Sequence, residues 1–222
     1  MAKSKRQPLI SPAGTLVWPH LNEADTKFDA DGVYDTKLRL SGEDATRLET
    51  LIDKAMDESL AKGKKDNPKK AGKMKMADPP FAPAVDDDDN ETGETEFKFK
   101  LNAKGSSKKT GKSWVNRPGL FDAKGTALVD VEIWGGTVAK IAYHMNFWHR
   151  ATDNATGVKL HLVGVQVLDL VSGGARTAEN IGFETEDGYE APEPGEAGNT
   201  DVPDVDPDDP GAAPAGDDEE MF

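Results

Sequence analysis

Cationic side chains alternate with apolar residues in two short segments of this 222-residue chain. Lys37 and Arg39 alternate with leucines in VYDTKLRL, and Lys98 and Lys100 alternate with phenylalanine and leucine in TEFKFKLNA. In a β-strand, such alternation places the apolar residues on one face and the cations on the other. Lys and Arg on an exposed strand face bind phosphate groups, so this spacing predicts a surface for a phosphate-bearing polyanion.

A lysine-rich segment, NAKGSSKKTGKSWVNRPG, surrounds Trp114 with almost no apolar neighbours. An exposed indole ring in such a segment can stack on a nucleobase of any type. Trp148 falls on the polar face of its segment by parity, whereas Trp18 and Trp134 are expected to pack inside the fold, as large rings usually do. The candidate nucleic-acid-binding residues are Lys37, Arg39, Lys98, Lys100, Lys109, Lys112, Trp114, Arg117, Lys140, His144 and Trp148. An ordinary solvated strand face is the alternative interpretation of the lysines.

Catalytic and metal-binding motifs are missing from the sequence. The chain has four histidines without H-E-x-x-H spacing, no cysteine, and no G-x-S-x-G motif. The letters G-K-S in GKSWVNRPG lack the glycine-rich loop that precedes them in a phosphate-binding loop. The acidic run DDDDNE is better explained as a solvated charge run than as a cation site. We therefore predict no enzymatic activity, no cofactor and no metal.

The negative charge is segregated along the chain. Residues 179–222 hold 16 of the 41 acidic residues and no Lys or Arg, although the whole chain has a net charge of -14. This composition, rich in Pro and Gly, predicts a disordered acidic tail. Its last residues combine acids with a terminal aromatic ring, which is typical of a partner-binding segment: Asp217, Asp218, Glu219, Glu220, Met221 and Phe222. No apolar run approaches the roughly 20 residues needed to span a bilayer, so we expect a cytoplasmic protein without membrane contact.

Period-two alternation predicts strands over residues 14–19, 33–40, 95–103, 127–134, 137–150 and 158–171. In the strand over 137–150, the residues expected to face the core are Ile141, Tyr143, Met145 and Phe147. One helix is predicted over 41–63, with Ser41 as N-cap and an apolar stripe that includes Leu48, Leu51 and Ile52.

Five or six strands with one helix after the second strand describe a mainly β protein, a small closed or partly open barrel. The leading candidate is an OB-fold (oligonucleotide/oligosaccharide-binding fold), and a β-sandwich is the alternative because strand order cannot be read from one sequence. The predicted organisation is a barrel domain over 1–178, with a flexible charged insertion at 64–96, followed by the disordered acidic tail over 179–222.

Three segments carry a resemblance to a known family: GTLVWPHLNEADTKFDADGVYDTKLRL, NRPGLFDAKGTAL and GGTVAKIAYHMNFWHRATDNATGVKLHLVGVQVLDL. With the helix between them, they make residues 12–172 resemble the single-stranded DNA-binding proteins encoded by tailed bacteriophages. The acidic run closed by Phe222 is a second likeness, although bacterial tails usually have Pro where this chain has Met221.

The resemblance implies an OB-fold that coats single-stranded DNA during phage replication, recombination and repair in the host cytoplasm, with duplex DNA or RNA bound more weakly. It also implies a tail that recruits replication proteins such as a polymerase or helicase and, in some members, supports assembly into a homo-oligomer. The alternatives are a virion or structural protein, or a DNA mimic, whose acidic tail only confers solubility.

Overall fold

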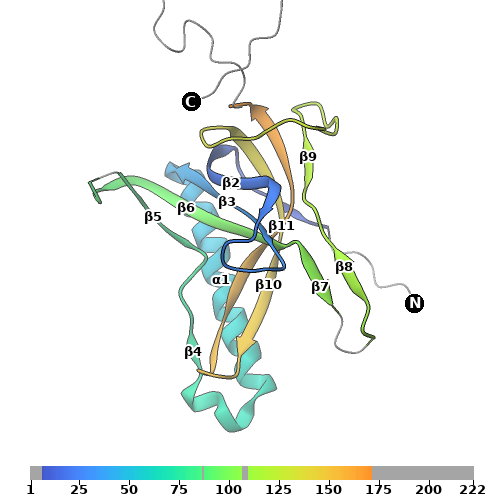
Figure 1. Ribbon diagram of the computed structural model, residues 1–222. Coiled ribbons are helices and arrows are strands. Elements are labelled where there is room, and N and C mark those ends of the chain that lie inside the picture. Colours follow the sequence, from blue (N-terminus) through green and yellow to red (C-terminus); the bar gives the residue numbers. More distant parts are fainter. Residues whose placement is uncertain (1–6, 87, 107–109, 172–222) are drawn as a thin grey trace, which may run out of the picture. The chain divides into compact units, whose positions relative to one another are not determined.

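The computed structural model describes residues 7–86, 88–106 and 110–171 (Figure 1). The acidic segment 179–222 lies outside these residues, so its disorder and the domain boundary at 178 stay predictions. In chain order the strands are β1 (Leu9–Ile10), β2 (Gly14–Asp25), β3 (Val33–Ser41), β4 (Lys75–Met76), β5 (Phe81–Val85), β6 (Glu91–Asn102), β7 (Lys104–Ser106), β8 (Ser113–Val115), β9 (Gly119–Phe121), β10 (Val138–Arg150) and β11 (Ala155–Asp169). The helices are α1 (Gly42–Asp66) and the 3₁₀ helix η1 (Pro68–Lys73).

Five strands close a ring, which is the central feature of the fold. β2 pairs with β3, β3 with β6, β6 with β11, β11 with β10, and β10 with β2; only the β6–β11 pair in this ring is parallel. The ring is uneven, because β10 and β2 are joined at only two residue pairs while β10 and β11 run together along their length. A mainly β, OB-like architecture is therefore confirmed, and the strands do not form the two packed sheets of a sandwich.

The interior of the ring follows from the alternation in the sequence. Leu38, Phe97, Phe99 and Ile141 are fully buried, as the predicted core faces of their strands require. The rings of Phe99 and Tyr143 meet edge-on with centroids 5.2 Å apart. Burial of these large side chains supplies most of the free energy that holds the ring closed.

The helix α1 covers the inner side of the lower part of the β10–β11 hairpin (Figure 1). Its buried residues include Leu48, Ile52 and Met56, and the Ser59 hydroxyl donates to the Gly157 carbonyl at 3.0 Å. Leu51 is exposed, contrary to the predicted stripe. The helix follows the third strand and not the second, because the two-residue strand β1 precedes β2 and is too short to give a sequence signal.

Regular elements occupy most of the segment 64–96, which the composition predicts to be a flexible insertion. α1 continues to Asp66, and η1, β4, β5 and the start of β6 follow. The backbone is fixed along the edge of β11, where the amides of Lys75 and Ala77 donate to the carbonyls of Asn154 and Thr156 at 3.0 and 2.9 Å. The described residues of the segment therefore hold regular elements where the composition predicts a flexible charged insertion, and long-range backbone hydrogen bonds to β11 are the physical reason.

The segment 127–134 forms no strand, although its residues alternate. The Asn22 side chain replaces a strand partner: its amide nitrogen donates to the Val131 carbonyl at 2.6 Å, and its amide oxygen accepts from the Ile133 backbone at 3.1 Å. Ile133 is buried, whereas Val129 is exposed. The Asn22 side chain thus holds residues 131–133 against β2, whereas an isolated bridge between Ala127 and Phe121 attaches the start of the segment to β9.

Candidate nucleic-acid interface

Four of the predicted cations lie together on the outer face of β3 and β6. Lys37 pairs across the strands with Lys98, and the adjacent pairs are Asp35 with Lys100 and Arg39 with Glu96. Period two places all six side chains opposite the buried leucines and phenylalanines. We call this surface, made of Asp35, Lys37, Arg39, Glu96, Lys98 and Lys100, the β3–β6 face.

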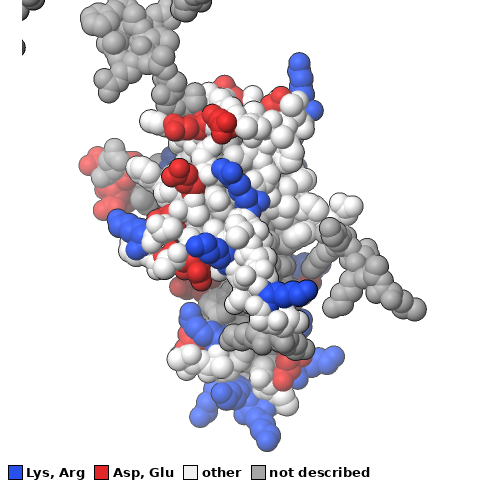
Figure 2. All heavy atoms as spheres, turned by 45° about the vertical axis from the view of Figure 1, so that its right-hand side comes forward, with Lys and Arg blue, Asp and Glu red and all other residues white. Residues whose placement is uncertain are grey.

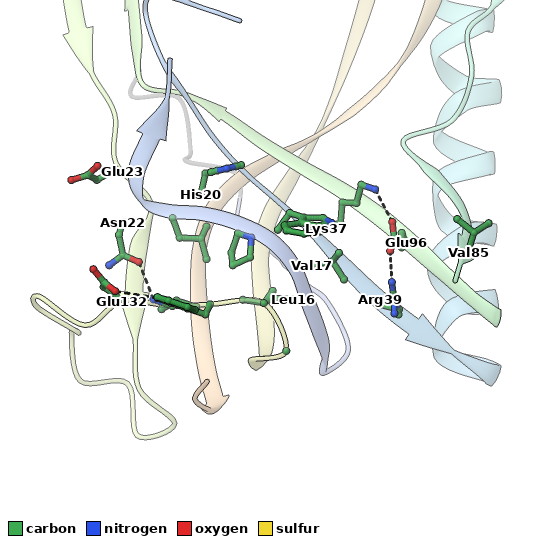
Figure 3. A pocket seen from close by; sticks show the side chains of 17 residues that line it. Leu16, Val17, His20, Asn22, Glu23, Lys37, Arg39, Val85, Glu96 and Glu132 are labelled. Atoms are coloured by element: carbon green, nitrogen blue, oxygen red, sulfur yellow. Dashed lines mark hydrogen bonds and ion pairs between the residues drawn. The ribbon is translucent and has the colours of Figure 1, made fainter. Parts of the chain in front are cut away.

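Glu96 neutralises part of this face (Figure 3). Its carboxylate accepts from Lys37 Nζ at 2.7 Å and from Arg39 Nη2 at 2.7 Å. Burial alone would raise the pKa of Glu96, but the hydrogen bonds from Lys37 and Arg39 outweigh it and lower the pKa. Lys37 and Arg39 are therefore held in place by a carboxylate that stays ionised.

Lys98 and Lys100 are exposed and form no ion pair with any described residue. Burial lowers the pKa of Lys98, and the neighbouring charges of Lys100 and Lys37 lower it further, whereas Asp35 opposes the shift. Asp35 itself accepts from His20 Nδ1 at 2.9 Å. A lysine whose charge is disfavoured by other cations gains most from an anionic ligand, so this pair is suited to phosphate.

Basic residues continue the β3–β6 face onto β11 and β10. His161 lies in register with Lys100 on the neighbouring parallel strand, and His144 lies opposite His161 in the β10–β11 ladder. Burial lowers the pKa of His161, with further contributions from the charges of Lys159 and His144. His144 was predicted from sequence, whereas His161 and Lys159 were not, since nothing local links β11 to β6.

Trp148 lies near the tip of the β10–β11 hairpin. It pairs with Gly157, where an added Cβ would lie 2.8 Å from the indole ring, so the ring rests on bare backbone. The Arg150 guanidinium lies 5.5 Å from the ring centroid and also donates to Asp153 at 2.8 Å, which lowers the Asp153 pKa to about 2. Trp148 is half-buried, and the cationic group beside its ring is the Arg150 guanidinium.

A second group of cations surrounds the end of α1, at the lower end of the molecule in Figure 2. The exposed side chains there are Lys62, Lys64, Lys65, Lys69, Lys70, Lys73 and Lys75. The tip of the β10–β11 hairpin adjoins this group, because Asn154 Nδ2 donates to the Lys70 carbonyl at 3.0 Å. This surface was not among the predicted site residues, although its lysine run is plain in the sequence.

The remaining predicted residues are not part of the β3–β6 face. Lys140 lines a separate apolar hollow with Ile10 and Phe121. Trp114 lies on the β7–β8 hairpin, half-exposed, with its ring over Gly105; Lys112, which is exposed, precedes it.

Arg117 donates to the Asn22 carbonyl at 2.9 Å, so its guanidinium ties the base of the hairpin to β2. Lys109 and the tail residues Asp217, Asp218, Glu219, Glu220, Met221 and Phe222 lie outside the described residues.

Trp18 and Trp134 contradict the prediction that they pack inside the fold. Trp18 is 78% exposed and Trp134 is 51% exposed. Trp18 has φ 48° and lies where the β2–β3 register breaks between Val17 and His20. The following Pro19 has no amide hydrogen to donate to the ladder, so the dipeptide Trp-Pro inside a strand is the signal that could have revealed a bulge.

These two tryptophans line a hollow of about 790 Å³ between β2 and the segment 131–136 (Figure 3). Leu16 and Ile133 contribute buried apolar surface, while Lys37 and Arg39 lie at its border with the β3–β6 face. Figure 3 shows Glu23 and Glu132 at the far end from these cations. The hollow therefore joins the cationic face to an aromatic and apolar surface.

Within the described residues, no three His, Cys, Asp or Glu side chains are grouped closely enough to hold a metal ion. None of the described helices is long and apolar enough to cross a membrane.

Phe147, predicted to face the core, is partly exposed beside Leu9 and Leu51, because β10 extends beyond the closed part of the ring.

Sequence comparison identifies one family. The model of the family described as single-stranded DNA-binding protein, bacteriophage T7, matches residues 10–170. The single-stranded DNA-binding protein of Enterobacteria phage T3 is 30% identical over 202 residues, covering 85% of this chain and 87% of the phage protein. The protein of the same name from Escherichia phage T7 is 29% identical over 167 residues, covering 72% of each chain.

Solved structures show the same fold. The crystal structure of the single-stranded DNA-binding protein encoded by bacteriophage T7 matches with a TM-score of 0.60 and 25% identity, covering 85% of this chain and 100% of that chain. The single-stranded DNA-binding protein of bacteriophage Enc34 in complex with single-stranded DNA matches with a TM-score of 0.52 and 14% identity, over 75% of this chain and 88% of that chain.

Proposed function

The chain belongs to the family of the bacteriophage T7 single-stranded DNA-binding protein, and from this we propose that it coats single-stranded DNA through the β3–β6 face. The observation that carries the proposal is the pair Lys98 and Lys100, two exposed lysines without an acidic partner among the described residues. In OB-folds the outer face of the second and third barrel strands binds oligonucleotides, and β3 and β6 occupy these positions in the ring.

The path that we propose for the strand runs across β3 and β6 and onto β11 and β10. Phosphates meet Lys98, Lys100 and Lys159, with His161 beside Lys100 on β11 and His144 opposite His161 on β10. Trp114 on the β7–β8 hairpin and Trp148 near the β10–β11 tip offer stacking surfaces on elements that adjoin this face. Such contacts accept any base, so the binding is independent of sequence.

The biological role that fits this site is coating and protection of single-stranded DNA in phage replication, recombination and repair, in the cytoplasm of the host cell. The composition of residues 179–222 supports a further part of the proposal, in which the tail recruits a replication protein such as a polymerase or helicase and competes with DNA for cationic surfaces. Assembly into a homo-oligomer and weaker binding of duplex DNA or RNA belong to the same proposal.

Fluorescence anisotropy of a labelled oligo-dT, beside a duplex of equal length and at two salt concentrations, tests the function. We expect preferential binding of the single strand, with log K falling against log salt by about 0.7 for each phosphate contacted. Absence of binding, both with the full chain and after deletion of the last ten residues, would rule the proposal out.

The affinity for single-stranded DNA should rise as the pH falls from 8 to 6. Burial and, after it, the charges of Lys159 and His144 lower the pKa of His161, and bound phosphates offset those charges, so binding is linked to uptake of a proton. A rise of one pKa unit on binding increases the affinity by up to about tenfold at low pH. Titration of oligo-dT at several pH values measures the effect.

The stability of the free protein should follow the opposite trend. The unfolded chain has the higher His161 pKa and binds the proton more readily, so the free energy of unfolding decreases as the pH falls below the ordinary value of about 6.5. His161→Gln should flatten both trends, and His149→Gln, at an exposed histidine near the hairpin tip, should flatten neither. An unchanged pH dependence of binding in His161→Gln would contradict this assignment.

A further inference from the structure

We propose that the hollow lined by Trp18 and Trp134 is a base pocket, which takes an unstacked nucleobase of the bound strand. The proposal rests on the function proposed above and adds a site beside the β3–β6 face, lined mainly by β2 and the segment 132–136. Its occupant is a neutral aromatic ring, and its walls are the two indoles. The geometry, rigidity and charge of the pocket each support this occupant.

The bulge in β2 turns Trp18 outward. Trp18 has φ 48°, in the left-handed region that costs a residue with a side chain about 1–3 kcal/mol. The surrounding structure enforces this conformation, because Pro19 cannot pair with β3 and His20 resumes the ladder opposite Asp35, with its ring bonded to that carboxylate at 2.9 Å. A strained backbone that presents a 78% exposed indole is typical of a ligand-binding position.

The opposite wall is equally well fixed. The Gly136 amide donates to the Leu16 carbonyl at 2.9 Å, and the Trp134 amide donates to the Val171 carbonyl at 2.9 Å. Asn22 holds residues 131 and 133 through its side-chain amide. The Trp134 indole nitrogen donates to Glu132 at 3.1 Å, which orients the ring. The wall needs no rearrangement before a ligand enters, so little ordering entropy opposes binding.

The charges around the pocket favour a base over a phosphate. Glu23 and Glu132 line it at one end, and Lys37 and Arg39 line its border with the β3–β6 face, where both are bonded to Glu96. An anion inside the pocket would meet the carboxylates of Glu23 and Glu132, whereas a phosphate at the border would meet Lys37 and Arg39, whose charges Glu96 neutralises only in part. A strand that crosses Lys98 and Lys100 can therefore keep its backbone at the border and turn a base inward.

The two indoles also lack aromatic partners within the described chain, where the ring pairs are Phe81 with Phe97 and Phe99 with Tyr143. The hollow of about 790 Å³, which both indoles line, is large enough for a nucleobase. Stacking of a base on an aromatic side chain contributes about 1–3 kcal/mol, so an occupied pocket makes a measurable difference to affinity.

Binding of oligo-dT is compared with binding of an abasic strand that has the same length and the same phosphates but no bases. The full chain is measured as wild type, as Trp18→Ala/Trp134→Ala and as the matched control Trp18→Phe/Trp134→Phe, which keeps aromatic rings. We expect the alanine variant to bind oligo-dT at least about fivefold more weakly, with an unchanged salt slope and an unchanged affinity for the abasic strand. The phenylalanine variant should retain most of the wild-type affinity.

Equal affinity of wild type and alanine variant for oligo-dT would overturn the proposal, as would an equal loss for both strands, which would indicate a structural role. In either case the wild-type protein still binds oligo-dT, so failure of the pocket is distinguishable from failure of the function proposed above. The second measurement uses Trp114→Phe/Trp148→Phe, in which Trp18 and Trp134 are the remaining tryptophans. We expect oligo-dT to quench the indole fluorescence of this variant. Absence of quenching would also overturn the proposal, and it does not depend on the folding of the alanine variant.

Discussion

Replacement of Lys98 and Lys100 together by glutamine lowers the affinity for oligo-dT about 25-fold at 0.1 M salt, because each phosphate contact contributes about 0.7 to the salt slope and hence about fivefold at this concentration. The slope itself should decrease by about 1.4. Both lysines are exposed on β6 and form no ion pair among the described residues, so their loss leaves no buried charge without a partner. Titrations of a labelled strand at three or more salt concentrations give both quantities.

The matched control is Lys54→Gln/Lys124→Gln, which removes the same charge from exposed positions on α1 and on the turn after β9. Long-range attraction falls equally in the two variants, so the difference between them isolates direct contact with phosphate. An equal loss in both variants would show that the β3–β6 face acts only through net charge. Thermal unfolding of each variant verifies that the fold is retained.

Phe99→Ala should reduce the free energy of unfolding by about 3–5 kcal/mol, the usual range for a buried phenylalanine. Phe99 is fully buried, meets Tyr143 edge-on at 5.2 Å, and lies in register with Leu160 on the parallel strand β11. Its removal leaves a cavity at the β6–β11 junction, where only two residue pairs join the strands and little other structure can collapse into the space. Urea denaturation followed by circular dichroism measures the change.

Phe28→Ala is the control for this substitution, since Phe28 is 89% exposed in the β2–β3 turn, where the ammonium group of Lys27 lies 5.4 Å from the centroid of its ring. Its stability should stay within about 0.5 kcal/mol of the wild type. A loss below about 1 kcal/mol for Phe99→Ala would contradict the view that the β6–β11 junction holds the ring closed. Phe99→Ala should also bind DNA poorly at temperatures where it unfolds, because Lys98 and Lys100 flank Phe99 on one strand.

The cationic character of the β3–β6 face was accessible from the sequence. Period-two alternation needs only neighbouring residues, so the sequence separates Lys37, Arg39, Lys98 and Lys100 from the buried leucines and phenylalanines with no knowledge of the strand order. The long helix was equally accessible, because its apolar stripe and its end at polar and glycine residues are local features. The family likeness over most of the chain followed from the same segments.

The neighbours of each strand were decided by the tertiary structure. His161 lies beside Lys100, and Asn22 holds residues 131–133, through pairings between segments about 60 and 110 residues apart. The order of the segment 64–96 likewise comes from backbone hydrogen bonds to β11, which its lysine-rich composition does not encode. Trp18 and Trp134 were expected inside the fold from the size of their rings, and their exposure depends on a bulge in β2 and on the segment that follows Ile133, which ring size does not encode.

The physical reason is the range of the interactions involved. Alternation records which face of a strand is apolar, a property set by residues two positions apart, and it therefore identified the cationic face. Closure of the ring brings β10 against β2 and β11 against β6, and it alone determines which side chains become neighbours across that face. The lysines proposed to bind phosphate could thus be named from the chain itself, whereas the proposed base pocket beside them depends on the folded ring, which sets two distant tryptophans around one hollow.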